Sequence, residues 1–354
     1  MAIGDLLHQT PVTTPDPYTG CPVTRLTPPD HTSHHMYFYN RMVTSDSSRL
    51  LYCAEINGRR NLYLMELATG DAVQLTEGDA LDDYGAMISA DDKSVYYQQD
   101  RKVWKLDLAT LQRTCLYAAP DGWDCGNWGM SDDNRYLVMT ETRRDTLPDL
   151  TGKKGWEFFP LTCAAKPLCH IVYLDTQTGE HHIVVEDRCW FGHAQLRPGD
   201  PDTILFCHEG PYDMIDARLW LIQSDGSRYR CARPQPKDVI ITHEFWMPTG
   251  DRLAYVYRKA DDGSTETIRM MRPETLEEEL FMPCLPYAHF ICDRQRRWFV
   301  GDCQGQETPI HLQTGEGRGQ EVRNDFIYLV DIARKKEIPL CYHGTSWTTI
   351  HGLS

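Results

Sequence analysis

The chain of 354 residues is long enough for a sizeable core, since 41% of its residues are hydrophobic and 25% are charged. Its formal net charge of −15, with no basic cluster, excludes a general nucleic-acid binder. No apolar run approaches the roughly 20 residues that cross a bilayer. The N-terminus lacks a secretory signal pattern, and the 13 cysteines form no C-x-x-C pair. We therefore expect a cytoplasmic protein with reduced thiols and no membrane partner.

One pattern recurs along the chain: a turn rich in Asp, Ser or Gly, followed by an apolar or alternating strand. The copies lie at 44–55, 89–99, 131–141, 197–209, 247–258 and 292–302. Most copies are followed by two further short strands. The strand centres are Leu51, Val95, Leu137, Ile204, Ala254 and Trp298, all expected on inner strands. A period of about 40–50 residues with several strands per unit favours β-propeller blades over a β-sandwich.

The repeat predicts a single all-β domain over 1–354 with about six full blades. An orphan outer strand near 21–27, "CPVTRLTPPD", precedes the first copy and has no inner strands of its own. In a propeller closed by pairing its termini, such a strand would complete the last blade. The longer step from Leu137 to Ile204 contains an insertion at 142–168, expected within the third blade region.

Histidines recur near strand ends that should reach the rim of the central channel. His34, His193 and His208 are our candidates for substrate binding, and His243 and His289 lie at the same phase of the repeat. A single histidine there is more simply structural, but several at one phase indicate a shared site. Neutral imidazoles accept protons near neutral pH and bind transition metals.

Arg218 is the cation expected at this site, because its planar fork can bind a carboxylate. An ion pair with an acidic residue such as Asp216 is an equally simple interpretation. Arg143 and Arg144 belong to the insertion and could cover the site, although a solvated loop is the simpler reading. Glu244 could orient His243 or contact a neighbouring blade, and the sequence leaves this open.

The stretches "CPVTRLTPPDHTSHHMYFYNR", "ILFCHEGPYDMIDARLWLI" and "THEFWMPTGDRLAYV" resemble oligogalacturonate lyases, almost from end to end. The resemblance implies a seven-bladed propeller in the bacterial cytoplasm that cleaves short pectin fragments, mainly digalacturonate. It implies metal-assisted β-elimination with Mn²⁺. It also implies that His243 is the proton-abstracting base, Arg218 the catalytic arginine and His289 a metal ligand.

The resemblance weakens at the end of the chain. The family's other metal ligands are a Gln and a His-x-His pair beyond "GTSW", where this sequence has "TTIHGLS" with His351. We therefore expect an incomplete last blade, weak manganese binding and weak activity. Two alternatives stay open: a non-catalytic binding propeller, and a lyase for another uronate oligomer.

Overall fold

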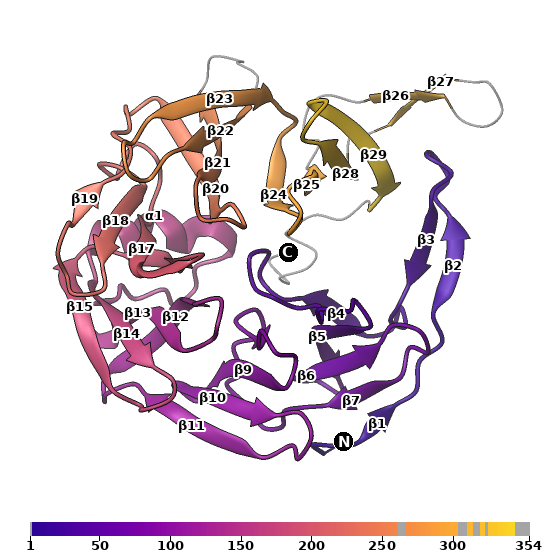
Figure 1. Cartoon of the computed structure of the whole chain (residues 1–354), viewed down its shortest axis with the longest axis horizontal. Coiled ribbons are helices and arrows are strands. Elements are labelled where there is room, and N and C mark those ends of the chain that lie inside the picture. The colour runs from indigo at the N-terminus through magenta and orange to yellow at the C-terminus, as the bar shows by residue number, and fades with distance from the viewer. Residues whose placement is uncertain (1, 261–265, 304–309, 314–318, 323–324, 344–354) are drawn as a thin grey trace.

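The computed structural model describes residues 2–260, 266–303, 310–313, 319–322 and 325–343. Six sheets, each of four or five antiparallel strands, are arranged around a common centre (Figure 1). The fold is therefore an all-β propeller. Among the described residues, no helix is long and apolar enough to span a membrane.

The first three blades follow the chain in order. Blade 1 holds β4 (Thr32–His35), β5 (Arg49–Ile56), β6 (Arg59–Glu66) and β7 (Ala72–Gln74), with β1 (Leu6–Leu7) added outside β7. Blade 2 holds β8 (Met87–Ile88), β9 (Ser94–Gln99), β10 (Lys102–Asp107) and β11 (Arg113–Ala118). Blade 3 holds β12 (Trp123–Met130), β13 (Tyr136–Arg143), β14 (Leu168–Asp175) and β15 (His181–Arg188).

The other three blades repeat this order. Blade 4 holds β16 (Phe191–Arg197), β17 (Asp200–His208), β18 (Leu219–Gln223) and β19 (Arg230–Cys231). Blade 5 holds β20 (Val239–Trp246), β21 (Leu253–Lys259), β22 (Thr267–Met271) and β23 (Glu278–Pro283). Blade 6 holds β24 (Tyr287–Cys292), β25 (Trp298–Cys303), β28 (Phe326–Asp331) and β29 (Lys336–Tyr342), with the hairpin β26 (Ile310–Gln313) and β27 (Gly319–Val322) between β25 and β28.

The core lies between neighbouring blades. Leu51, Val95, Leu137, Ile204 and Ala254 are all fully buried, as the repeat predicts, although they belong to the second strand of each blade and not to the innermost one. Adjacent residues of one strand face opposite neighbours, because side chains alternate along a strand. In β13, for example, Leu137 joins the cluster shared with blade 2 and Val138 the cluster shared with blade 4.

The seven-bladed count implied by the family resemblance is wrong for the described residues, which form six blade sheets, the number of full blades that the repeat along the chain predicts. The orphan strand near 21–27 is β3 (Pro22–Arg25), and it does have a partner, β2 (Val12–Pro15), in a separate two-stranded sheet. This N-terminal hairpin lies between the first and last blades (Figure 1). Leu26, just after β3, packs on blade 1, and Tyr18 packs on blade 6. The sequence pattern missed β2, which had no apolar alternation to mark it.

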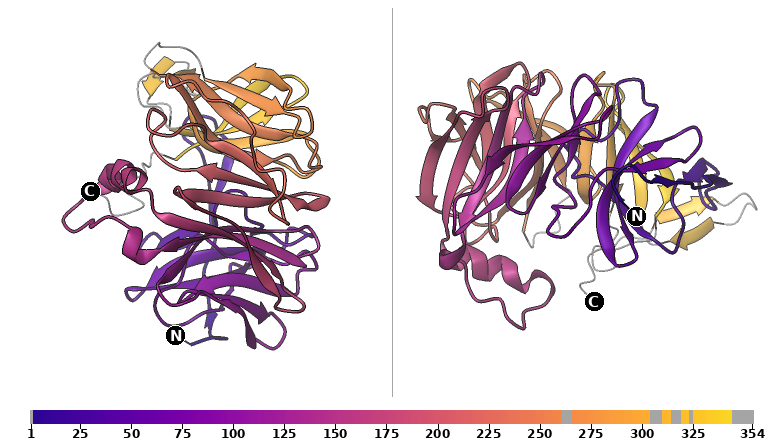
Figure 2. Two further views of the ribbon diagram at one scale, coloured as in Figure 1. Left: turned by 90° about the vertical axis from the view of Figure 1, so that its left-hand side faces the viewer. Right: turned by 90° about the horizontal axis from the view of Figure 1, so that it is seen from below.

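The expected insertion at 142–168 corresponds to the connection 144–167 between β13 and β14, which contains η1 (Arg144–Thr146), η2 (Gly155–Glu157) and α1 (Phe158–Ala165). This segment projects from one face of the ring (Figure 2). Phe159 packs edge-on against Trp190, directly before β16. Arg143 pairs with Asp145 at 2.8 Å and Arg144 with Asp124 at 3.7 Å, and both arginines are about half exposed.

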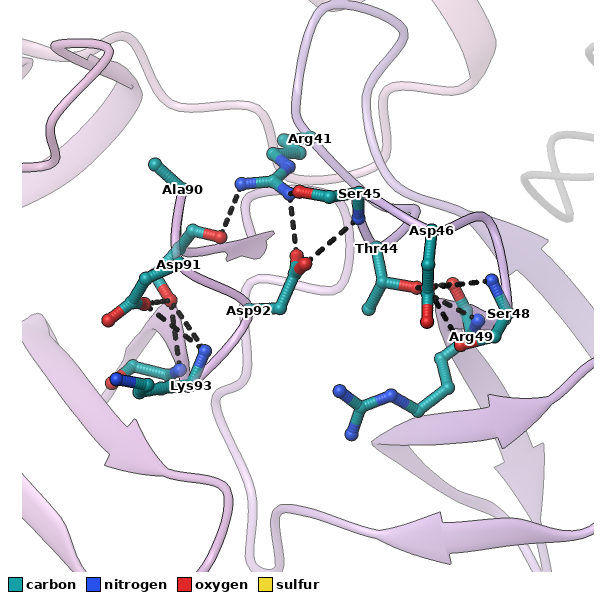
Figure 3. Close-up of polar contacts among 12 residues, drawn as sticks. Arg41, Thr44, Ser45, Asp46, Ser48, Arg49, Ala90, Asp91, Asp92 and Lys93 are labelled. Atoms are coloured by element: carbon teal, nitrogen blue, oxygen red, sulfur yellow. Dashed lines mark hydrogen bonds and ion pairs between the residues drawn. The ribbon is translucent and has the colours of Figure 1, made fainter.

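The Asp-rich turns owe their composition to hydrogen bonding. The Thr44 hydroxyl donates to Asp46 at 2.7 Å, and Asp46 accepts the backbone N–H of Ser48, which closes the turn (Figure 3). Asp92 of the next blade's turn accepts from Arg41 and from the backbone N–H of Ser45, so the same kind of carboxylate also joins neighbouring blades. Equivalent hydroxyl-to-carboxylate bonds occur at Ser89–Asp91, Ser131–Asp133 and Thr249–Asp251.

Candidate active site

Four of the six innermost strands carry a bulge at one level of the channel. The register shifts between Cys125 and Trp128 in β12, Gly192 and Gln195 in β16, Thr242 and Phe245 in β20, and Tyr287 and His289 in β24. A bulge leaves residues out of the ladder and re-aims their side chains. His193 and His243 occupy such bulges with φ of 51° and 58°, a conformation uncommon for residues other than glycine.

In blade 1 a longer excursion replaces the bulge. His35 pairs with Tyr52 and the carbonyl of Met42 accepts from Leu51, so residues 36–41 leave the ladder between two adjacent positions of β5. Three consecutive aromatic residues, 37–39, lie in this loop. The Tyr37 ring centroid is 5.4 Å from that of His193 and 5.6 Å from that of His289.

Arg218 is buried between two carboxylates. Its Nε and Nη2 donate to Glu244 at 2.8 and 3.1 Å, and its Nη1 and Nη2 donate to Glu209 at 3.0 and 3.2 Å. Burial opposes ionisation of both glutamates, but the charges of Arg218 and His193 and the hydrogen bonds to Arg218 together lower the pKa of each carboxyl. The expected ion pair of Arg218 is therefore formed with Glu209 and Glu244, and Asp216 is exposed.

The two glutamates extend this network within blade 4 and join it to blade 5. His193 Nε2 lies 3.1 Å from Glu209, and the Cys207 thiol donates to Glu244 at 2.8 Å. Gly192 makes room for Glu209, because a Cβ atom at position 192 would lie 2.5 Å from its Oε1. Glu244 thus contacts a neighbouring blade and does not orient His243, which answers the question that the sequence left open.

His243 lies beside this ion cluster. Its ring centroid is 5.0 Å from that of His289, and its side chain is partly exposed. Burial lowers the pKa of His243 well below 6.5, and the nearby His289, Arg218 and His193 lower it further. A neutral imidazole with some access to the channel is suited to accept a proton.

The structure thus brings together four of the six candidates: His243, Arg218, His193 and His289. His208 lies elsewhere, stacked on Trp220 at 4.4 Å between ring centroids, and burial lowers its pKa to about 4. His34 lies in blade 1, 3.5 Å from Asp83. His208 lies away from the cluster because side chains alternate along β17. It follows Cys207, which faces Glu244, and therefore points to the opposite face of the strand.

The model of the oligogalacturonate lyase family matches residues 1–353. The oligogalacturonide lyase of Pectobacterium atrosepticum is 35% identical over 99% of this chain and 89% of its own length. The oligogalacturonate lyase of Dickeya dadantii is 36% identical over the same shares. This chain belongs to the oligogalacturonate lyase family. It is accordingly a lyase.

Two solved structures of oligogalacturonate lyases have the same fold. One, in complex with manganese, has a TM-score of 0.88 and 36% identity and matches 98% of this chain and 88% of its own. The other, from Vibrio parahaemolyticus, has a TM-score of 0.87 and 35% identity, with the same coverage.

Around His289, the described residues of this chain do not supply a complete set of manganese ligands. His289 has Asp302 at 3.8 Å and His243 next to it, but no set of three His, Cys, Asp or Glu ligand atoms surrounds it there. His351 lies outside the described residues. His343, within them, has its Nε2 3.1 Å from the carbonyl of Cys303.

A cavity of about 510 Å³ opens in the channel, and its lining does not include the ion cluster. It is lined by residues that follow the bulges, such as Gln195, Phe245 and Trp246, and by turn residues such as Asp132. In the channel of this lyase, the cavity therefore lies on the side of the Asp-rich turns. The cluster of charged and aromatic side chains lies where the innermost strands bulge.

Sequence reasoning missed the parts played by Glu209, Tyr37 and Gly192. A signal was present for Glu209, because the sequence holds two His-Glu pairs near strand ends, His208–Glu209 and His243–Glu244. It is the glutamates of those pairs that meet at Arg218. No sequence signal marked Gly192, whose role depends on the distance between two adjacent strands.

Proposed function

We propose that this lyase cleaves short oligogalacturonides, with digalacturonate as the preferred substrate, by β-elimination during pectin breakdown. The observation that carries the proposal is the meeting of a neutral, partly exposed imidazole, His243, with a buried guanidinium at one level of the channel. The proposal includes a cytoplasmic location, because thirteen free cysteines are best kept reduced there.

In the proposed reaction, His243 accepts the proton from C5 of the galacturonide, next to the carboxylate. The electron pair left on C5 forms the C4–C5 double bond, the C4–O bond breaks, and the departing oxygen takes up a proton. Removal of such a weakly acidic proton requires positive charge near the substrate carboxylate, where negative charge develops.

In this proposal Arg218 supplies a fixed positive charge, and its guanidinium does not clamp the substrate carboxylate with two N–H groups. Its four bonds to Glu209 and Glu244 leave one of its five N–H groups for the substrate, so a bidentate clamp on the uronate would first have to displace a glutamate. Glu209 and Glu244 act as positioning residues that hold the guanidinium in one orientation. Two carboxylates flank one guanidinium, so the cluster carries a net negative charge that would repel an anionic substrate. A bound cation would offset this charge, and the assay therefore varies Mn²⁺.

The test is to incubate the full chain with digalacturonate, with and without Mn²⁺, and to follow the ultraviolet absorbance of the unsaturated uronate product. Loss of a general base costs about 10²–10⁴-fold in rate, and we expect this for His243→Ala. His182→Ala, on the outermost strand β15, is the matched control and should keep the wild-type rate.

Near-wild-type turnover of His243→Ala would remove His243 from the role of base. Product from another uronate oligomer but not from digalacturonate would reassign the substrate. Binding of digalacturonate with no product under either metal condition would favour the binding-propeller alternative.

A further inference from the structure

A second cluster of metal-binding side chains lies in blade 1. His34 of β4, Cys53 of β5 and Asp83 of the loop between β7 and β8 each offer one ligand atom, and these three atoms lie within 4.8 Å of one another. Nε2 of His34 is 3.5 Å from Oδ2 of Asp83. His34 and Cys53 are directly opposite each other in the β4–β5 ladder, so the backbone itself holds two of the three side chains together.

The His34 ring is oriented as a metal-binding imidazole is. Its Nδ1 lies 3.1 Å from the backbone carbonyl of His35, and its face stacks on Tyr84 with centroids 4.1 Å apart. A proton on Nδ1 donated to that carbonyl leaves the Nε2 lone pair facing Asp83. Hydrogen bonds of this kind fix the tautomer of metal-binding histidines. In that tautomer a lone pair and a carboxylate oxygen face each other at 3.5 Å, and a cation between them would bind both.

The surroundings favour a cation of small size. The three side chains line a cavity of about 10 Å³, which is the room that one water-sized sphere requires. Glu55 and Arg60 share this cavity, and Arg60 donates to both Asp83 and Glu55. Arg60 bonds Oδ2 of Asp83 at 2.7 Å and Glu55 at 3.1 Å, so one guanidinium charge is shared between two carboxylates. The group keeps a net negative charge, which a thiolate at Cys53 would increase and a divalent cation would offset.

We propose that His34, Cys53 and Asp83 form a Zn²⁺ site with a fourth position open to water. A thiolate, an imidazole and a carboxylate are a zinc donor set, whereas manganese prefers carboxylate, carbonyl and water oxygen. Zinc binding releases the thiol proton, since the ligand is the thiolate. The site is separate from Arg218 and His243, and it would brace the aromatic loop, because the backbone N–H of Tyr37 donates to the carbonyl of Tyr84 at 3.0 Å.

The test uses Co²⁺ as a spectroscopic substitute for zinc in the full, metal-free chain. We expect one equivalent of Co²⁺ to give a thiolate-to-cobalt charge-transfer band and the visible bands of tetrahedral cobalt, and one equivalent of Zn²⁺ to abolish both. Excess Mn²⁺ should leave them unchanged. Cys53→Ser should lose the charge-transfer band, and Asp83→Asn should weaken cobalt binding by at least about 10²-fold, the upper end of what loss of a supporting partner costs.

Cys115→Ser is the matched control, because Cys115 is an exposed free thiol on β11 and its loss should leave the spectrum intact. Circular dichroism of each variant checks the fold, and Asp83→Asn gives an answer even where Cys53→Ser fails to fold. A cobalt spectrum that persists in Asp83→Asn at full affinity, or that disappears in Cys115→Ser, would overturn the proposal, as would the absence of any thiolate band in the wild type.

Discussion

Arg218 lies beside His243 and is held between the carboxylates of Glu209 and Glu244. Its position near His243 could be expected from the repeat and the family resemblance. Its four hydrogen bonds to Glu209 and Glu244 could not, because they join side chains of two blades whose separation the sequence does not specify. Removing one partner from a buried ion pair typically destabilises a protein by about 3–5 kcal/mol, so these residues are structurally as well as chemically coupled.

Arg218→Lys keeps the charge and loses the planar fork. We expect the unfolding free energy to fall and kcat to decrease by about 10²-fold, since one ammonium group cannot bridge both glutamates in the same geometry and a misplacement of about 1 Å costs that much. Kinetics on digalacturonate and urea denaturation measure the two effects. Wild-type kcat in Arg218→Lys would mean that only the charge matters.

At the scale of elements, the bulges in the innermost strands turn side chains of a repeated strand toward one shared site. Four innermost strands carry a register shift at the same level, and two of these shifts present a histidine with positive φ. The sequence showed histidines at one phase of the repeat but not the bulges. Bulges depend on how each strand pairs with its neighbour, and pairing is not a property of one segment.

Gly192→Ala tests the bulge of β16 without touching a charged group. The added Cβ would lie 2.5 Å from Oε1 and 2.6 Å from Cγ of Glu209, so the carboxylate must shift away from Arg218. We expect kcat to fall by about 10-fold or more with little change in the circular dichroism spectrum. In a Glu209→Gln background the same change should lower kcat much less. An equal loss of kcat in both backgrounds would contradict an effect that acts through the Glu209–Arg218 ion pair.

The turns give a pH dependence of stability. Hydrogen bonds from the backbone N–H of Ser48 and the Thr44 hydroxyl lower the pKa of Asp46 from 3.8 to about 2. A lowered carboxyl pKa stabilises the fold above the unfolded value and is lost as the pH falls through the folded value. We expect Asp46→Asn to be less stable than the wild type at pH 6, with the difference shrinking below about pH 4 as measured by urea denaturation at each pH. A difference independent of pH would contradict this origin.

At the scale of the whole molecule, the N-terminal hairpin connects the two ends of the blade series. Asp16, between β2 and β3, accepts backbone N–H groups from Tyr18, Thr19 and, at 2.8 Å, Tyr342 of β29. The Thr19 hydroxyl donates to the carbonyl of Leu340 at 2.6 Å. The propeller class was predictable from the 40–50-residue period, but this joint was not, because a contact between turn residues and a distant strand leaves no periodic signal.

Asp16→Asn should weaken this joint. The amide can accept but no longer offers a charged acceptor to several N–H groups, and loss of such bonds at a buried position costs about 1–3 kcal/mol of unfolding free energy. Urea denaturation measures the change. Asp30→Asn, on an exposed turn before β4, is the control and should lie within about 0.5 kcal/mol of the wild type. Equal stability of the two variants would show that the joint contributes little.

The joint also sets an order of events during synthesis. Its hydrogen bonds connect residues 321 and 326 positions apart, so at 5–20 residues per second the N-terminal turn emerges tens of seconds before its partners exist. The five interblade cores can form one after another while this delay lasts. During the same time β2 and β3 pair only with each other, as a two-stranded sheet. Sealing of the ring is then a late event of folding. A weakened joint such as that of Asp16→Asn should accordingly speed unfolding and leave the rate of refolding nearly unchanged.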